Sequence, residues 1–246
     1  MTWNRDSSID VLIPARDEEL ALPQLLAEID RTNLRHILVV DNGSSDRTAR
    51  LAREQGAIVI FCKQAGYGRA CLAGMEHMSR NPPDILVFLD GDRSDHPRYI
   101  QSLCTPIIEG SHDMVLTSRT LGQAEAGSLT MTQVFGNRLA TSLMRFFWNT
   151  DYTDLGPFRA IRWDALKALE MNDTNYGWTI EMQIKAACAA LRVLEIPVDY
   201  RNRIGVSKIS GTLSGVIKAG TKIIYTIFKY RLLTRSWRSG RAKVRS

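Results

Sequence analysis

The first half of the chain alternates short apolar runs with stretches of helical periodicity. Five nearly continuous apolar runs, rich in β-branched residues, are typical of strands buried on both faces of a parallel sheet. They lie at Ile9–Pro14, His36–Asp41, Ala57–Cys62, Asp84–Asp90 and Asp113–Ser118. Helical patterns separate them, opening at Pro23 and following Ser45 and Gly68. This alternation predicts an α/β fold with a mostly parallel, doubly wound sheet and helices on both of its faces.

The second half of the chain departs from this alternation. A long amphipathic helix is expected over Ser128–Trp148, and a further helix is expected from about Trp163. The remaining patterns predict a short strand at Phe158–Ile161, a helix around Ile180–Leu191 and a strand at Val193–Val198. Because no internal repeat or low-complexity linker interrupts the chain, we expect one folded domain over residues 1–208 and a C-terminal segment over residues 209–246.

The C-terminal segment combines an apolar helical face with basic residues. Lys218, Lys222 and Lys229 lie on one side of the expected helix. The opposite face consists of Leu213, Val216, Ile217, Gly220, Ile223, Ile224, Ile227 and Phe228. No uncharged apolar run approaches the roughly 18 residues that a membrane-spanning helix needs. The pattern predicts an amphipathic helix lying in a membrane interface, and the alternative is a helix that packs against its own domain.

The charge of the chain is distributed unevenly. From Arg201 onward there are 12 Lys and Arg residues and no Asp or Glu, so the net charge of +6 for the whole chain leaves −6 for residues 1–200. A basic tail on an acidic body is typical of proteins that meet polyanions. We expect an anionic membrane surface as the partner, not nucleic acid, because aromatic residues among the basic ones are limited to Tyr230 and Trp237.

Two further features bear on the compartment. The N-terminal residues have no apolar core of a secretory signal. The four cysteines are scattered and contain no CxxC pair, which argues against a disulfide framework or a zinc site. We therefore expect a cytoplasmic protein that is peripheral on the inner face of the cell membrane.

The sharpest chemical signal is the segment VFLDGDRSDHP, in which Asp90 and Asp92 follow a predicted strand and flank Gly91. In open α/β sheets, ligands bind beyond the carboxyl ends of the strands. Carboxylate oxygens select Mg²⁺ or Mn²⁺, which typically bind a few carboxylates together with substrate phosphates. Two aspartates alone could be exposed turn residues, but their position at a strand end favours a metal site.

Acidic turns also follow the first two strands. Glu18 belongs to the turn PARDEE and Asp41 to the turn DNGSSD. Helix capping could explain each turn separately. It does not explain why the turns share acidic side chains that the fold would bring to one edge of the sheet.

Several common nucleotide-binding and hydrolytic motifs are absent from the sequence. The segment Gly66-Tyr-Gly-Arg-Ala-Cys71 has a cysteine where a dinucleotide-binding fingerprint needs its third glycine, and it follows the third strand instead of the first. We expect it to form a tight loop that opens a helix near a ligand. The sequence also lacks a P-loop and a nucleophile elbow, which excludes P-loop kinases and α/β-hydrolases.

The segments VLIPARDEE, VVDNGSSDRTA, GYGRA and FLDGDRSDHP, in this order and spacing, resemble the inverting family 2 glycosyltransferases with the GT-A fold. Four later segments are similar to dolichol-phosphate mannose synthases and bacterial polyprenyl-phosphate glycosyltransferases. These are GNRLATSLMRFF, DLGPFRAIRWDAL, GWTIEMQIKA and IPVDYRNRIGVSKISGTLSGVIKAGTKII. The resemblance spans about Ile9 to Leu233, nearly the whole chain.

The resemblance implies a role for each matched residue. The nucleotide-sugar site would comprise Pro14, Arg16, Glu18, Asp41, Asp90, Arg203, Ser207 and Lys208, and the last three would close over the donor phosphates. Asp90 and Asp92 would hold the donor diphosphate through Mg²⁺ or Mn²⁺. The acceptor site would comprise Arg119, Asn137, Arg138 and Ser142. The expected catalytic residues are Asp92, Arg138 and Glu181, of which Glu181 would serve as a base for a hydroxyl acceptor or would be a helix-surface carboxylate.

The implied reaction is metal-dependent, inverting transfer of one sugar from a UDP- or GDP-sugar to a polyprenyl or dolichyl phosphate at the cytoplasmic membrane face. A phosphate acceptor is already ionised at neutral pH, so a strong general base is dispensable. Cationic groups near the leaving diphosphate would stabilise its developing charge. The alternatives are a transferase of the same fold with a soluble or glycerolipid hydroxyl acceptor, and a non-catalytic membrane-associated protein with a degenerate transferase fold.

Overall fold

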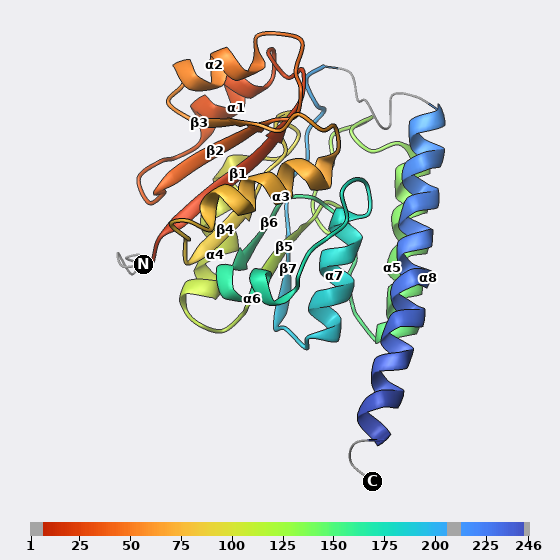
Figure 1. Cartoon of the computed structure of the whole chain (residues 1–246). Helices are drawn as coiled ribbons and strands as arrows, with labels where there is room; N and C mark the ends of the chain where they lie inside the picture. The colour runs from red at the N-terminus through yellow and green to blue at the C-terminus, as the bar shows by residue number, and fades with distance from the viewer. Residues whose placement is uncertain (1–6, 206–212, 244–246) are drawn as a thin grey trace.

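The computed structural model describes residues 7–205 and 213–243, with side chains described over 218–233 in the second range. Within these ranges seven strands form one sheet in the order β3-β2-β1-β4-β6-β5-β7 (Figure 1). Neighbouring strands are parallel except at β6, which is antiparallel to β4 and β5. The strands are β1 (Ile9–Ala15), β2 (His36–Asp41), β3 (Ile58–Phe61), β4 (Ile85–Phe88), β5 (Met114–Ser118), β6 (Arg159–Arg162) and β7 (Val193–Pro197). The predicted mostly parallel α/β sheet is confirmed.

Helices cover both faces of the sheet, also as predicted. One face packs against α1 (Leu22–Glu28), α2 (Thr48–Glu54) and α4 (Ile100–Ile108), which follows a short 3₁₀ turn. The other face packs against α3 (Tyr67–Met78), α6 (Trp163–Ala168) and α7 (Trp178–Cys188). Two further helices, α5 (Met131–Trp148) and α8 (Leu213–Lys243), lie side by side outside α7 (Figure 1).

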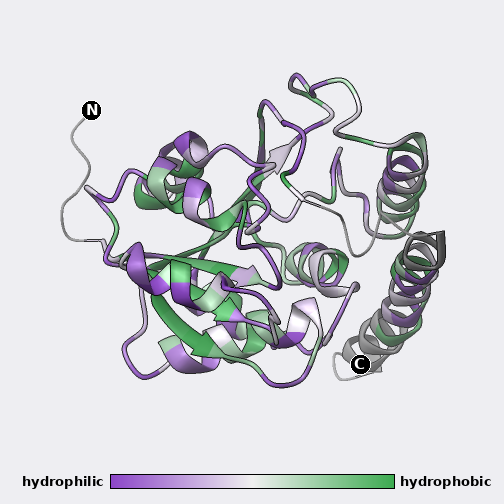
Figure 2. Cartoon of the chain, turned by 90° about the horizontal axis from the view of Figure 1, so that it is seen from above, coloured by the Kyte–Doolittle hydropathy of each residue, from purple (hydrophilic) through white to green (hydrophobic). Residues whose placement is uncertain are grey.

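The strands bury both of their faces because successive side chains alternate between two cores. In β4, Leu86 and Phe88 enter the core on the α3 side, whereas Ile85 and Val87 enter the core on the α4 side. Figure 2 shows the strands in the green of hydrophobic residues, with purple concentrated in the surrounding loops and outer helix faces. The prediction of two buried faces is wrong for β3, because this strand lies at the sheet edge and leaves Phe61 63% exposed.

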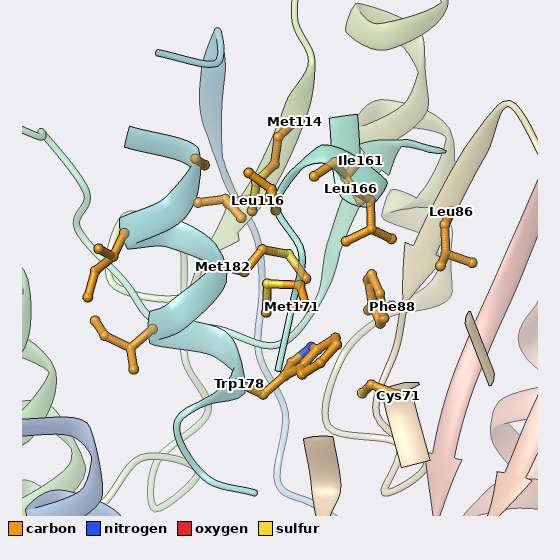
Figure 3. Close-up of a cluster of buried hydrophobic side chains, with 14 of the residues drawn as sticks. Cys71, Leu86, Phe88, Met114, Leu116, Ile161, Leu166, Met171, Trp178 and Met182 are labelled. Atoms are coloured by element: carbon orange, nitrogen blue, oxygen red, sulfur yellow. The ribbon is translucent and has the colours of Figure 1, made fainter. Parts of the chain in front are cut away.

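Aromatic and sulfur-containing side chains pack among aliphatic ones in the core between the sheet and α7 (Figure 3). The indole of Trp178, at the start of α7, meets the ring of Phe88 edge-on, with 6.1 Å between the ring centroids. Met171, Met182 and Cys71 belong to the same cluster. Trp178 thus fixes the first turn of α7 against the end of β4, beside the loop that carries Asp90.

The helix α5 has clear local determinants. Thr130 and Gln133 form a capping box at its N-terminus, and Asn149 ends it in the left-handed conformation with φ of 55°. Helix α8 packs along α5 and α7. Ile227 and Tyr230 of α8 are buried, and Ile223 and Ile224 contact the core.

The apolar face of the C-terminal helix was expected in a membrane interface, but as far as its side chains are described it packs largely against the protein. Of its members, Phe228 stays about half exposed while its ring contacts Phe147, with 5.8 Å between centroids. Other apolar residues of α8, including Leu232, face outward instead. No helix within the described ranges is long and apolar enough to cross a membrane. The expected boundary between residues 208 and 209 lies outside the described residues and stays a prediction.

Candidate active site

A cavity of about 250 Å³ lies at the carboxyl ends of β1 and β4. Its walls come from the turns after β1, β2 and β4, the start of α3, the loop before α7 and the segment after β7. The lining residues are Pro14, Ala15, Arg16, Glu18, Asn42, Ala65, Gly66, Tyr67, Ala70, Asp90, Gly91, Asp92, Asn175, Tyr176 and Arg203. The structure therefore brings together six predicted donor-site residues, namely Pro14, Arg16, Glu18, Asp90, Asp92 and Arg203.

Asp90 and Asp92 follow β4 and occupy different surroundings. Asp90 Oδ1 accepts a hydrogen bond from the Tyr67 hydroxyl over 2.9 Å. Asp92 Oδ1 accepts one from the backbone N–H of Ser94 over 2.9 Å. Burial, reinforced by the neighbouring charge of Asp92, raises the pKa of Asp90 to about 7. Burial and then the charge of Asp90 raise the pKa of Tyr67 well above its usual range, so this phenol stays a hydrogen-bond donor at neutral pH.

Arg203 lies across the acidic side of the cavity. Its guanidinium donates from Nη2 to Glu18 Oε1 over 3.1 Å, and its Nη1 lies 3.3 Å from Asp92 Oδ2. Its Nε is buried and has no hydrogen-bond partner among the described residues. A buried donor without a partner is costly, and an anionic ligand in the cavity would satisfy it. Ser207 and Lys208, expected beside Arg203, lie outside the described residues.

The turn after β2 contributes an amide, not a carboxylate, to the cavity. Asp41 is buried, and its Oδ1 accepts the N–H of Ser44 over 2.9 Å, so it shapes the turn and does not line the cavity. Asn42 lines the cavity instead. Its side chain donates to Gln64 O over 2.8 Å and accepts from Gly66 N over 2.7 Å, which holds the glycine loop against the cavity. The expected tight loop that opens a helix is present, because α3 begins at Tyr67.

Two of the predicted acceptor residues are already engaged by other groups. Arg119 donates from Nε and Nη2 to Asp154 over 2.7 Å each. Burial opposes ionisation of Asp154, but the charge and hydrogen bonds of Arg119 outweigh burial and lower its pKa. Asn137 braces the same segment, donating to Thr153 O and accepting from Leu155 N over 2.9 Å each. Neither residue lines the donor cavity.

The other two predicted acceptor residues are free to meet a ligand from solution. Arg138 and Ser142 are exposed, one turn apart on α5. Exposed apolar residues lie along the same helix, including Phe135 and Phe146. An apolar surface that carries an arginine suits a ligand with a hydrophobic chain and an anionic head.

Glu181 is not the helix-surface carboxylate that the sequence suggested. It is fully buried, because α8 covers the first turns of α7. Its Oε1 accepts from the Tyr230 hydroxyl over 2.6 Å and lies 2.8 Å from Lys185 Nζ, and its Oε2 accepts from Asp173 N over 2.6 Å. Glu181 does not line the cavity, so the geometry gives no support to its expected role as a base.

The sequence reasoning missed several residues around the cavity. Asn175 and Tyr176 line it from the loop before α7, where no motif drew attention to them. Asp95 follows Asp90 and Asp92 in the same segment, and the sequence pointed to no role for it. It is buried, and neither carboxylate oxygen has a hydrogen-bond partner among the described residues. Burial and then the charge of Asp90 raise the pKa of Asp95 well above its usual range, which favours its neutral form.

The whole chain has recognisable relatives. Glycosyl transferase family 2 matches residues 10–169. A dolichyl-phosphate hexose transferase of Haloferax volcanii is 30% identical over 240 residues, covering 94% of this chain and 99% of the relative. A polyprenol monophosphomannose synthase of Mycolicibacterium smegmatis is 27% identical over 215 residues, covering 82% of this chain and 81% of the relative. An uncharacterised glycosyltransferase of Mycobacterium tuberculosis is 33% identical over 217 residues, covering 86% of this chain and 94% of the relative.

Solved structures show the same fold. Glucosyl-3-phosphoglycerate synthase from Mycobacterium tuberculosis, in complex with Mn²⁺, UDP-glucose and phosphoglyceric acid, matches with a TM-score of 0.73 at 20% identity, covering 92% of this chain and 80% of that one. The expected GT-A fold is thereby confirmed. The family match and the relatives, which are named as transferases, set aside the alternative of a non-catalytic protein. The chain belongs to glycosyl transferase family 2 and is a glycosyltransferase.

Proposed function

We propose that this glycosyltransferase moves one sugar from a UDP- or GDP-sugar to a polyprenyl or dolichyl phosphate, with inversion, at the cytoplasmic face of a membrane. The observation that carries the proposal is the cavity at the sheet edge, where Asp90, Asp92 and Arg203 converge. Relatives named for polyprenol and dolichyl phosphate support the acceptor.

The described residues fit a bound Mg²⁺ or Mn²⁺. Asp90 and Asp92 offer carboxylate oxygens at the cavity, and no group of three metal-binding side chains occurs within the described ranges. Two carboxylates leave positions for diphosphate oxygens and water, which is how Mg²⁺ is usually held. When bound, such a cation would stabilise the negative charge that develops on the leaving diphosphate.

Other residues of the cavity would bind the donor or orient the groups that bind it. Arg203 would turn its guanidinium from Glu18 and Asp92 toward the diphosphate, where Nε would gain an acceptor that no described residue provides. Tyr67 keeps Asp90 oriented through its hydroxyl. Pro14, Arg16 and Asn42 would line the nucleotide side of the cavity.

For the acceptor we propose the exposed side of α5. Arg138 and Ser142 would bind its phosphate, whose oxygen attacks the sugar without a general base. Arg119 and Asn137 would act indirectly, by holding the 153–155 segment through Asp154 and the backbone. Among the described residues that line the cavity, the only carboxylates are Glu18, which pairs with Arg203, and the two aspartates assigned to the metal. This supports a phosphate acceptor over a hydroxyl.

The membrane side of the proposal rests on exposed apolar residues. Most of the large exposed hydrophobic residues of the described chain belong to α5 and α8. These are Met131, Phe135, Leu139, Phe146, Tyr225, Phe228, Leu232 and Leu233, called here the outer apolar surface. Basic residues accompany them, among them Arg145 and Lys229. Such a surface favours contact with anionic lipid.

The test is a panel of UDP- and GDP-sugars incubated with a short polyprenyl phosphate or with hydroxyl acceptors, in Mn²⁺ or Mg²⁺, with products read by mass spectrometry. We expect a single-sugar polyprenyl phosphate product. Asp92→Asn should lower turnover on the order of 10²–10³-fold without unfolding the protein. Transfer only to hydroxyl acceptors, or near-native turnover by Asp92→Asn at saturating metal, would contradict the proposal.

A further inference from the structure

The loop between α6 and α7, residues 170–177, forms one wall of the donor cavity. Asn175 and Tyr176 line the cavity from this loop. The backbone of the loop lies against the start of α3, where Arg69 N donates to Thr174 O over 3.1 Å. A Cβ atom at Gly68 would lie only 2.0 Å from Asp173 O, so the close approach requires glycine there. The position of the 170–177 loop therefore depends on close packing against Gly68 at the start of α3.

Two carboxylates hold the loop in this conformation. Asp173 Oδ1 accepts the N–H groups of Asn175 and Gly177, over 2.8 and 3.1 Å. Glu181 accepts the N–H groups of Asn172 and Asp173, over 3.1 and 2.6 Å. Four backbone amides of the loop thus depend on two acidic side chains. Met171, near the start of the loop, and Trp178, directly after it, are anchored in the core (Figure 3).

Helix α8 supplies a partner to each of these carboxylates. Lys222 Nζ lies 2.8 Å from Asp173 Oδ2. The hydroxyl of Tyr230, two turns further along α8, donates to Glu181 Oε1 over 2.6 Å. A fully buried carboxylate such as Glu181 needs each of its hydrogen-bond donors, since the loss of one leaves charge uncompensated. The C-terminal helix is in this way connected to the cavity wall through the Lys222–Asp173 and Tyr230–Glu181 contacts.

We propose that Lys222 and Tyr230 of α8 are positioning residues for the sugar-nucleotide donor. They set the place of Asn175 and Tyr176 through Asp173 and Glu181, and they do not touch the donor themselves. The inference rests on the proposed use of the cavity for a nucleotide sugar. It assigns Glu181 a role in donor affinity, in place of the expected proton transfer.

The test compares full-length Tyr230→Phe and Lys222→Gln with Lys218→Gln, which removes the same charge from an exposed position one turn earlier on α8. Titration calorimetry with UDP and with GDP, in Mn²⁺, measures donor-site affinity. We expect both test variants to bind nucleotide roughly 3- to 30-fold more weakly, a range typical of residues that act through a packed network. The donor KM should rise equally, with the acceptor KM little changed, and Lys218→Gln should match the wild type.

Hydrogen exchange provides a readout that needs no ligand. The amides of Asn172, Asp173, Asn175 and Gly177 should exchange faster in the two test variants than in Lys218→Gln. Unchanged exchange of this loop in the two test variants would overturn the inference. So would unchanged nucleotide affinity in these variants, provided that the wild type binds nucleotide. A wild type that binds neither nucleotide and transfers no sugar would overturn the proposed function instead, and the exchange data would still decide the positioning of the loop.

Discussion

Asp90 and Asp92 are separated by one glycine, yet they differ in how they are compensated. Asp92 faces the guanidinium of Arg203, whereas Asp90 has the neutral hydroxyl of Tyr67. Burial and the charge of Asp92 therefore act on Asp90 and raise its pKa to about 7. The site therefore holds one carboxyl, that of Asp90, whose pKa is close to neutral pH.

This raised pKa predicts a pH-dependent stability. A carboxyl whose pKa is higher in the folded state stabilises the fold below its ordinary pKa of about 3.9, and this stabilisation is lost as the pH rises through about 7. The ligand-free protein should therefore melt at a lower temperature at about pH 8 than at about pH 5. Asp90→Asn should reduce this difference in thermal melts, and the exposed Asp164→Asn should leave it unchanged. An equal pH dependence in all three proteins would contradict the assignment.

At the scale of elements, glycines distinguish crowded from open helix positions. Gly68 at the start of α3 has no room for a side chain beside Asp173 O, whereas a Cβ atom at Gly136 in α5 would meet nothing within 4 Å. We expect Gly68→Ala to lower the free energy of unfolding by about 1–3 kcal/mol. Gly136→Ala should raise it by about 0.5–1 kcal/mol through helix propensity. Urea unfolding measures both, and shifts of the same sign would refute the described packing.

The exposed side of α5 gives a second prediction at this scale. Arg138→Ala should raise the KM for the phosphate acceptor by roughly 10- to 100-fold, because a charge-assisted hydrogen bond is lost. Nucleotide affinity by calorimetry should barely change. Arg145→Ala, two turns further along α5, is the matched control. If nucleotide affinity collapsed while the acceptor KM held, the arginine would belong to the donor instead.

The elements and part of the cavity could be predicted from sequence because both follow local rules. Apolar runs marked the strands, and parallel strands bring the acidic turns that carry Glu18 and Asp92 to one edge. Which strand lies at the edge is a tertiary fact, so the exposure of β3 was missed. The burial of Glu181 was missed for the same reason, since helical periodicity does not say that α8 covers α7. Tyr176 was not predicted to line the cavity, because the path of its loop is determined by packing against α3.

For the molecule as a whole, the outer apolar surface predicts membrane binding. The full-length protein should sediment with anionic vesicles, less so at high salt, because basic side chains contribute a screened attraction. Phe135→Ser together with Leu232→Ser should weaken binding roughly tenfold or more through lost apolar contact. Phe61→Ser is the control, because Phe61 is an exposed apolar residue of the edge strand β3 and does not belong to the outer apolar surface. No sedimentation at low salt would leave the membrane proposal without support.

Removing α8 is a poorer test of membrane binding than these substitutions. A chain truncated after Gly211 would lose Ile227 and Tyr230 from the core along with any lipid contact. We expect this truncation to melt at a lower temperature than the full chain. A loss of vesicle binding by the truncated protein would then not distinguish a missing lipid contact from a destabilised fold.

The contact of Arg203 with Glu18 and Asp92 means that the donor site carries its own counterion. A lone divalent cation meets carboxylates that are already partly neutralised, whereas a diphosphate offers the displaced guanidinium a new anion. Metal and nucleotide should consequently enter as a synergistic pair. Calorimetric titration of Mn²⁺ should thus give weak heats alone and tight binding once UDP or GDP is present, and Arg203→Gln should reduce that synergy. We expect the same guanidinium, by returning to its carboxylates, to compete with the product nucleotide and so to favour its release.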